Sequence, residues 1–379
     1  MAAAAFIPPP YPFDRLGAMA LLAESIDGGM VDCSIGTPCD PVPKFVVEAS
    51  IEAASQSAGY PLSAGSAGYR SAAADWIQRR LGVTVDPMSQ LGVCLGTKEF
   101  VGGLPHLLCR RDPGRDTVLF PSISYPTYEM GATLAGLRSV AVPLDADWHL
   151  DVDRIDPSDA RRALVLWINE PGNPSASSAD DAYFAKVASW GREHGVLIAS
   201  DECYIEFAPV RSTILSAGAQ GVLSVQSLSK RSNMAGMRCG FYAGDSEIVN
   251  FLIEARKHWG FIASTPTQAA GIAALRDDTH VDMQLGRYRE RREMMLSALE
   301  PLGFVHDGGP TAFYLWLRDD RGVEDGWELA ARFAHAGVLV TPGDIFGVAG
   351  ADHVRLALVQ PTERLQFAAE RLTDLMDKE

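Results

Sequence analysis

The stretch Ser227–Arg238, which reads SLSKRSNMAGMR, decides how the rest of the chain is interpreted. It follows the β-rich run 222–226, so a strand is predicted to end where this stretch begins. It brings together a lysine, small hydroxyl side chains and an arginine. An amine can form a Schiff base with a carbonyl compound, while hydroxyls and a guanidinium hold a phosphate. The stretch therefore predicts a site for a phosphorylated carbonyl compound such as pyridoxal phosphate, and a solvated Lys-Arg turn is the alternative.

Length and composition describe an ordinary globular protein. The chain has 379 residues, which at roughly 100 to 200 residues per domain suggests two domains. Its hydrophobic content is 47% and its charged content is 21%. A formal net charge of −15 argues against a nucleic-acid-binding protein, because phosphate backbones select clustered lysine and arginine.

The sequence also bears on the compartment. The N-terminus lacks a charged region followed by an apolar run, and no window approaches the ~20 apolar residues of a membrane span. The six cysteines are scattered, with neither a CxxC pair nor metal-ligand spacing. We therefore expect a cytoplasmic protein with reduced thiols, no metal site and no membrane contact.

Short apolar runs alternate with helical patterns between residues 90 and 244. The runs predicted to be strands are 90–95, 117–120, 139–142, 163–168, 196–200, 222–226 and 239–243. This alternation predicts an α/β fold with a mostly parallel sheet covered by helices. The later sequence is mainly helical and leads to a smaller unit, with strands predicted at 313–317, 338–341 and 353–358 and helices at 325–336 and 363–377.

Polar side chains follow four successive predicted strands. Tyr125, Asn173, Asp201 and Lys230 each lie just after one of them. Because ligands bind outside the carboxyl ends of parallel strands, we expect these four side chains to converge. Each has a structural alternative: a stacking ring, a turn former before proline, a helix cap or a solvated cation. Their occurrence at successive strand ends favours one common site.

These residue types suit pyridoxal phosphate. A buried carboxylate, Asp201, can keep the pyridine nitrogen protonated so that the ring accepts electrons. Tyr204 and Asn173 can donate to the ring's phenolate oxygen, and Tyr125 can cover a ring face. For the phosphate we expect backbone amides where a helix begins, together with side chains from the stretch quoted above. The predicted phosphate-binding residues are Gly96, Thr97, Lys98, Ser227, Ser229 and Arg238.

With these motifs the chain resembles a known family, the fold-type I pyridoxal-phosphate aminotransferases of class I and II. In that family a serine lies three residues before the cofactor-binding lysine and an arginine lies eight residues after it, as Ser227, Lys230 and Arg238 do here. The run NEPGNPSA at 169–176 resembles the family's Asn-Pro-x-Asn-Pro-Thr-Gly, and Asp201–Tyr204 resembles its Asp-x-x-Tyr. The departure is Ser-Ala in place of Thr-Gly, which leaves the turn geometry of this loop open.

The resemblance implies further features. It implies an aspartate aminotransferase-like large domain and a smaller α+β domain built from both termini. We place an N-terminal arm and part of the small domain at 1–41, the large cofactor-binding domain at 42–272 and the small C-terminal domain at 273–379. Arg355 would fork onto the substrate α-carboxylate beside Gly36. Tyr60 would reach the phosphate of a neighbouring subunit, so the resemblance implies a homodimer.

A narrower resemblance concerns the substrate. Segments 32–43, 61–70, 227–240 and 339–347 look like the bacterial succinyldiaminopimelate aminotransferases of lysine biosynthesis. This implies amino transfer between glutamate or 2-oxoglutarate and N-succinyl-2-amino-6-oxopimelate, with Arg231, Lys257 and Arg318 as candidates for a second carboxylate. The alternatives are an aminotransferase for aspartate or an aromatic amino acid, a pyridoxal-phosphate β-lyase, or a regulator without turnover. A regulator would need a DNA-binding module, for which neither terminus has the length or basic charge.

Overall fold

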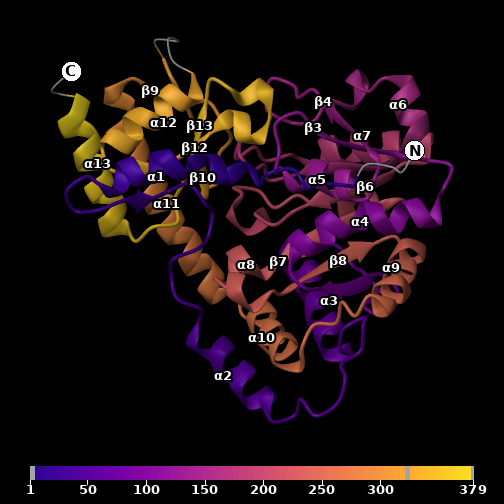
Figure 1. The fold of residues 1–379 in the computed structure, drawn as a ribbon. Coiled ribbons are helices and arrows are strands. Elements are labelled where there is room, and N and C mark those ends of the chain that lie inside the picture. Colours follow the sequence, from indigo (N-terminus) through magenta and orange to yellow (C-terminus); the bar gives the residue numbers. More distant parts are fainter. Residues whose placement is uncertain (1–4, 321–324, 377–379) are drawn as a thin grey trace.

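A seven-stranded sheet forms the centre of the larger unit in this computed structural model, which describes residues 5–320 and 325–376 (Figure 1). Its strand order is β2-β8-β7-β6-β5-β3-β4. The strands are β2 (Leu91–Cys94), β3 (Thr117–Pro121), β4 (Arg138–Val142), β5 (Ala163–Asn169), β6 (Leu197–Asp201), β7 (Val222–Ser227) and β8 (Gly240–Gly244). Only β8 runs antiparallel to its neighbours within this sheet, which confirms the predicted mostly parallel arrangement.

Helices cover both faces of this sheet because successive strand residues point to opposite sides. In β5, Val165 and Trp167 belong to one core cluster, and Leu166 and Ile168 belong to another. The first cluster contains residues of α4 (Thr97–Arg111), α5 (Thr127–Leu134) and α9 (Ser246–His258). The second contains residues of α2 (Lys44–Ala54), α3 (Ala67–Leu81), α6 (Pro157–Arg162), α7 (Asp181–His194) and α10 (Thr265–Arg276).

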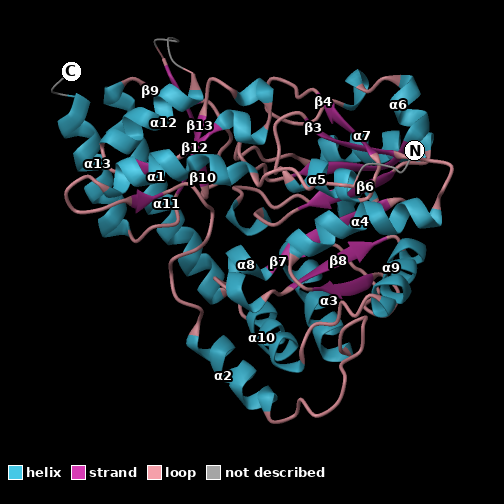
Figure 2. Cartoon of the chain, viewed as in Figure 1, coloured by secondary structure: helices cyan, strands magenta, loops and turns pink. Residues whose placement is uncertain are grey.

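The smaller unit combines residues 17–32 with the C-terminal part of the chain, as the neighbouring labels α1, α12 and α13 show (Figure 2). An antiparallel sheet holds β12 (Thr341–Pro342), β13 (Val354–Ala357), β10 (Tyr314–Asp319) and β9 (Phe304–His306), in that order. Near the N-terminus, β1 (Val31–Asp32) pairs in parallel with β11 (Val338–Leu339). The helices of the smaller unit are α1 (Gly17–Glu24), α11 (Thr279–Leu299), α12 (Gly326–His335) and α13 (Thr362–Met376). The predicted small α+β unit built from both termini is therefore confirmed, whereas the limits at residues 41 and 272 stay predictions.

Short helices fill several connections. They are α8 (Leu228–Arg231) and the 3-10 helices η1 (Pro12–Leu16), η2 (Val152–Arg154), η3 (Ile205–Phe207), η4 (Ile214–Ala217), η5 (Ala235–Met237), η6 (Glu300–Leu302), η7 (Gly343–Phe346) and η8 (Val348–Gly350). Three of them matter for the site, because α8 carries Lys230 and both η1 and η5 contribute residues to the wall of the cavity described below.

Some element limits differ from the prediction. The sequence pattern predicts a helix over 125–134, but α5 begins at Thr127, because Tyr125 precedes Pro126 and a residue before proline disfavours helical geometry. The strand β9 and the helix α6 are short and were not predicted. The last predicted helix was expected to reach Asp377, which lies outside the described residues.

Two further observations concern the whole described chain. All six cysteines are within it and are free thiols. No helix among residues 5–320 and 325–376 has both the length and the apolar character needed to cross a membrane.

Candidate active site

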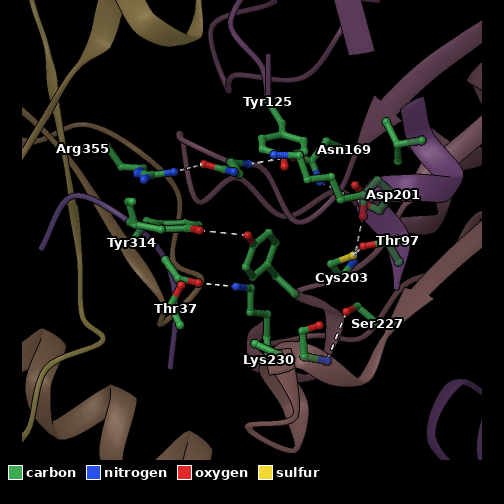
Figure 3. Close-up of a pocket in the computed structure, with 18 of the residues that line it drawn as sticks. Thr37, Thr97, Tyr125, Asn169, Asp201, Cys203, Ser227, Lys230, Tyr314 and Arg355 are labelled. Atoms are coloured by element: carbon green, nitrogen blue, oxygen red, sulfur yellow. Dashed lines mark hydrogen bonds between the residues drawn. The ribbon is translucent and has the colours of Figure 1, made fainter. Parts of the chain in front are cut away.

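A cavity of about 270 Å³ opens where β3, β5, β6 and β7 end (Figure 3). Apart from the three candidates for a second carboxylate, its wall includes all but two of the residues that the sequence predicts for cofactor and substrate. Those in the wall are Gly36, Thr97, Lys98, Tyr125, Asn173, Asp201, Tyr204, Ser227, Ser229, Lys230, Arg238 and Arg355. The other two are Gly96, which is adjacent to Thr97, and Tyr60.

Lys230 lies in α8, directly after the carboxyl end of β7. Its Nζ donates a hydrogen bond to the Gly36 carbonyl, and the same atom lies 5.8 Å from the centre of the Phe313 ring. Burial disfavours the charged form of the amine and lowers its pKa to about 8. A lysine with this pKa has a larger neutral, nucleophilic fraction near neutrality than a solvated lysine.

Asp201 ends β6 and is buried. Its Oδ2 accepts a hydrogen bond of 2.9 Å from the Tyr128 hydroxyl, and its Oδ1 accepts one of 3.2 Å from the Cys203 amide. Burial raises the pKa of Asp201, and these hydrogen bonds oppose the rise because they favour the carboxylate. A cation placed against Asp201 would favour the carboxylate further.

A cradle for an anion lies beside Lys230. Gly96 occupies the N-cap of α4 with a φ of +78°, a conformation that suits glycine. A Cβ at this position would lie 2.5 Å from a guanidinium nitrogen of Arg238, so the glycine allows Arg238 to lie against the turn. Ser227 accepts a hydrogen bond of 3.1 Å from the Ser229 amide. The positive end of the α4 dipole and this guanidinium together suit a phosphate.

A second cation lies across the cavity, where β13 holds Arg355 in a buried position. Its guanidinium donates to Asn173 Oδ1 at 2.7 Å and to the Ser34 carbonyl, and lies 4.5 Å from the centre of the Tyr314 ring. Its buried Nε has no hydrogen-bond partner in the structure. Gly36 is next to this group, since a Cβ there would overlap the Tyr314 hydroxyl. An unpaired buried donor on a planar guanidinium suits a carboxylate ligand.

Tyr204 contacts Tyr314 in the cavity wall. Its hydroxyl is 2.8 Å from the Tyr314 hydroxyl, and either can be the donor. Burial raises the pKa of both phenols, so both remain neutral donors near neutrality.

Four predicted positions lie elsewhere. Tyr60 is fully exposed, with a relative accessibility of 100%. The three candidates for a second carboxylate are absent from the cavity wall. Arg231 is buried against Glu206, Lys257 lies 3.7 Å from Glu254, and Arg318 lies 2.7 Å from Asp307.

Sequence reasoning missed several residues of the cavity wall: Tyr11, Phe13, Ile35, Thr37, Val101, Asn169, Cys203, Ala235 and Tyr314. Asn169 and Cys203 lie within motifs that were recognised for their neighbours. Tyr128 binds Asp201 from outside the wall and lies in the first turn of α5, three residues after Tyr125. No pattern in the proline-rich start points to Tyr11 or Phe13.

Comparisons with known proteins agree with this geometry. The family described as aminotransferase class I and II matches residues 29–372. The chain belongs to the class I and II aminotransferases. A relative in Streptomyces rimosus, 4-dedimethylamino-4-oxo-anhydrotetracycline transaminase OxyQ, is 38% identical, and the match covers 96% of this chain and 99% of that protein.

Two further relatives carry diaminopimelate names. The LL-diaminopimelate aminotransferase of Aquifex aeolicus is 35% identical, and the match covers 97% of each chain. A solved structure of a probable N-succinyldiaminopimelate aminotransferase from Thermus thermophilus has a TM-score of 0.86 and 31% identity, with 96% of this chain and 100% of that chain covered.

The cofactor of this aminotransferase family is pyridoxal phosphate, and the cavity fits it. The fit rests on the amine of Lys230, the buried carboxylate of Asp201 and the cradle that a Cβ at Gly96 would fill. These three groups match the carbonyl, the ring nitrogen and the phosphate of one molecule.

The Tyr128 hydroxyl should determine how tightly the aminotransferase holds its cofactor. Replacing Tyr128 by Phe removes a hydrogen bond that favours the Asp201 carboxylate, so the cofactor Kd should rise at pH values where this loss leaves Asp201 protonated. The same loss raises the pKa of Asp201, so cofactor binding should fail at a higher pH on acidification than in the wild type. Absorbance titration of the cofactor-free enzyme at several pH values measures both effects.

Tyr183→Phe is the matched control, because the Tyr183 hydroxyl donates to the Leu150 carbonyl and not to the site. It should leave unchanged both the cofactor Kd and the pH below which the cofactor no longer binds. If cofactor binding by Tyr128→Phe failed at the same pH as in the wild type, the role assigned to the Tyr128 hydroxyl would be contradicted.

The pH dependence of cofactor attachment should report the pKa of Lys230. Because burial lowers that pKa to about 8, the amine becomes neutral well below the pH at which a solvated lysine does. The rate of covalent attachment of pyridoxal phosphate to the cofactor-free enzyme should therefore rise with pH, with a midpoint near 8. Stopped-flow absorbance measures this rate, and a midpoint near 10.5, the ordinary lysine value, would show that burial does not tune this amine.

Proposed function

We propose that this aminotransferase moves an amino group between glutamate or 2-oxoglutarate and N-succinyl-2-amino-6-oxopimelate, in diaminopimelate and lysine biosynthesis. The observation that carries the proposal is a further cation in the cavity wall besides Arg355. Lys98 places its Nζ 3.2 Å from the Tyr11 hydroxyl and 4.7 Å from the centre of the Tyr11 ring. An acceptor with one carboxylate beside its oxo group and others farther along its chain can bind both cations.

The residues of the chain would divide the work as follows. Lys230 holds the cofactor and then, as general base and acid, moves the substrate's α-proton. Arg355, steadied by Asn173, binds the α-carboxylate, and this orients the substrate for that transfer. When bound, the cofactor supplies a ring that accepts the electron pair left on the substrate's α-carbon when the proton departs. Asp201 keeps the ring nitrogen protonated.

The remaining site residues would hold the cofactor. Tyr204 and Asn173 would donate to the ring oxygen, and Tyr125 would cover one face of the ring. The phosphate would be bound by the α4 turn and the residues after β7: Gly96, Thr97, Lys98, Ser227, Ser229 and Arg238.

The relatives support this proposal and also one alternative. The Aquifex aeolicus and Thermus thermophilus proteins carry diaminopimelate names, in line with a substrate that has several carboxylates. The Streptomyces rimosus relative is named for an oxo-anhydrotetracycline, and it favours a large polycyclic acceptor. The two candidates differ chemically, because a carboxylate-rich acceptor needs a second cation and a polycyclic one does not.

A panel of acceptors tests the function. With glutamate as donor, N-succinyl-2-amino-6-oxopimelate should give a kcat/KM at least about tenfold above those of oxaloacetate, phenylpyruvate and an anhydrotetracycline ketone, as expected for one additional ion pair of about 1.4 kcal/mol. Release of pyruvate and ammonia from a cysteine-type substrate would instead favour a β-lyase. Lys230→Ala should lose both turnover and the visible absorbance of the bound cofactor.

The same panel, with pyruvate added as an acceptor that has one carboxylate, isolates the second cation when it is run with Lys98→Met. The variant keeps the backbone amide at the α4 turn, so its KM for the succinylated acceptor should rise about tenfold while its KM for pyruvate changes little. Lys257→Met is the matched control, because this lysine lies outside the cavity wall. An equal change in KM for both acceptors in Lys98→Met would contradict the assignment of Lys98.

We also infer a homodimer in which Tyr60 reaches the phosphate of the neighbouring subunit. In support, α2 and the loop after it expose large apolar side chains: Phe45, Ile51 and Leu62, besides Tyr60 itself. A group of exposed apolar residues around a fully exposed tyrosine suits a protein interface.

Subunit mixing tests this arrangement. Lys230→Ala lacks the amine, and Tyr60→Ala would lack the contact to the neighbouring phosphate. A hybrid with one subunit of each kind has one site with both Lys230 and Tyr60, so mixing the two weak variants after mild dissociation should restore activity to about one quarter of wild type, counting random pairing. No recovery, in a mixture shown by native mass spectrometry to contain hybrids, would place Tyr60 at its own subunit's site or outside any site.

A further inference from the structure

Two segments that carry site residues contact each other through side chains outside the cavity wall. One is 201–207, with Asp201 and Tyr204, and the other is 228–232, with Lys230. Arg231 and Glu206 connect them, because Arg231 Nε donates to Glu206 Oε1 at 3.2 Å. Both side chains are almost completely buried, at 4% and 2% exposure. A buried ion pair thus lies one residue after Lys230 and two residues after Tyr204.

Glu206 remains charged in this interior. Trp76 donates to its Oε1 at 2.9 Å, and Arg80 and Arg211 donate to its Oε2 at 2.9 and 3.0 Å. Burial raises the pKa of Glu206, but the charges of Arg231 and Arg80 outweigh burial and leave the pKa below its ordinary value. Glu206 would therefore keep partners if any one arginine were removed.

Arg231 is held at its other side too. Its Nη1 donates to the Ala274 carbonyl at 2.8 Å and to Ser232 Oγ at 3.2 Å. The guanidinium carbon lies 5.7 Å from the centre of the Trp76 ring. These contacts orient the planar guanidinium, so the short helix α8 cannot rotate about its axis without breaking them.

Ser232 is bound from the same side by a histidine. Its Oγ is 2.9 Å from His280 Nε2, and His280 Nδ1 is 2.7 Å from Asp277 Oδ1. This serine, histidine and aspartate have the connectivity of a hydrolase relay. Ser232 has 0% exposure, so no substrate reaches it, and the three residues instead fix the end of α8.

We propose that Arg231 is a positioning residue for Lys230, and that its ion pair with Glu206 holds the Lys230 amine in register with Asp201 and Tyr204. The short helix α8 has only four residues, so it cannot fix the lysine backbone by its own hydrogen bonds. The buried partners of Arg231 supply that rigidity. The inference goes beyond the choice of acceptor, because it concerns an amine that acts on every substrate of the enzyme.

The test compares Arg231→Met with Arg211→Met. Each substitution removes one of the arginines that donate to Glu206. Arg211 is not next to Lys230, so Arg211→Met is the matched control for the loss of a positive charge near Glu206. In Arg231→Met the cofactor Kd should rise and kcat should fall, each about tenfold to a hundredfold, with a smaller change in KM, because a small misplacement of a reacting group costs that much. The pH midpoint of the bound cofactor's visible absorbance, measured without substrate, should also shift by about half a unit or more.

A conservative variant and a comparison of Tm values distinguish a positioning role of Arg231 from a role in folding alone. Arg231→Lys keeps the charge and should recover part of the loss, while Arg211→Met should retain the wild-type Kd, kcat and absorbance midpoint even if its Tm falls as much. If Arg231→Met does not fold, Arg231→Lys is compared with Arg211→Lys by the same readouts. Wild-type values in the folded Arg231 variant, or an equal midpoint shift in the Arg211 variant, would overturn the proposal.

Discussion

The parallel arrangement of β3, β5, β6 and β7 is the constraint on which the site depends. These strands are neighbours in the sheet, so their carboxyl ends meet at one edge. Tyr125, Asn173, Asp201 and Lys230 come together although more than a hundred residues separate the first from the last.

The electrostatics of the cavity follow from burial. Asp201 and Lys230 are both shifted toward their neutral forms, because desolvation disfavours charge in the absence of an adequate partner. Arg355 keeps one donor unpaired in a buried position. Under the proposed function, pyridoxal phosphate and a carboxylate substrate would supply the charges that these groups lack. The same features that cost stability in the free protein therefore favour ligand binding.

The sequence predicted those parts of the site that occur in compact motifs. Lys230, Ser227 and Arg238 lie within twelve residues after one strand, and the strand itself shows in the apolar run before it. Tyr11 and Tyr314 reach the cavity through long-range packing of the chain's two ends, which no local pattern encodes. Arg231 was predicted to bind a substrate carboxylate because of its charge, but the structure shows that it pairs with the buried carboxylate of Glu206.

The loop that carries Asn173 shows how a departure from the family pattern can be accommodated. Ala176 has a φ of +58° at the position where the family has glycine, at a cost of about 1 to 2 kcal/mol. Glycine would lose the buried Ala176 methyl, worth about 0.8 kcal/mol, and would cost about 0.5 to 1 kcal/mol more entropy on folding. These terms nearly cancel, so alanine is tolerated here. The loop is also held by the bond from the Gly309 amide to the Ser175 carbonyl, at 2.7 Å, and Asn173 therefore keeps its place beside Arg355.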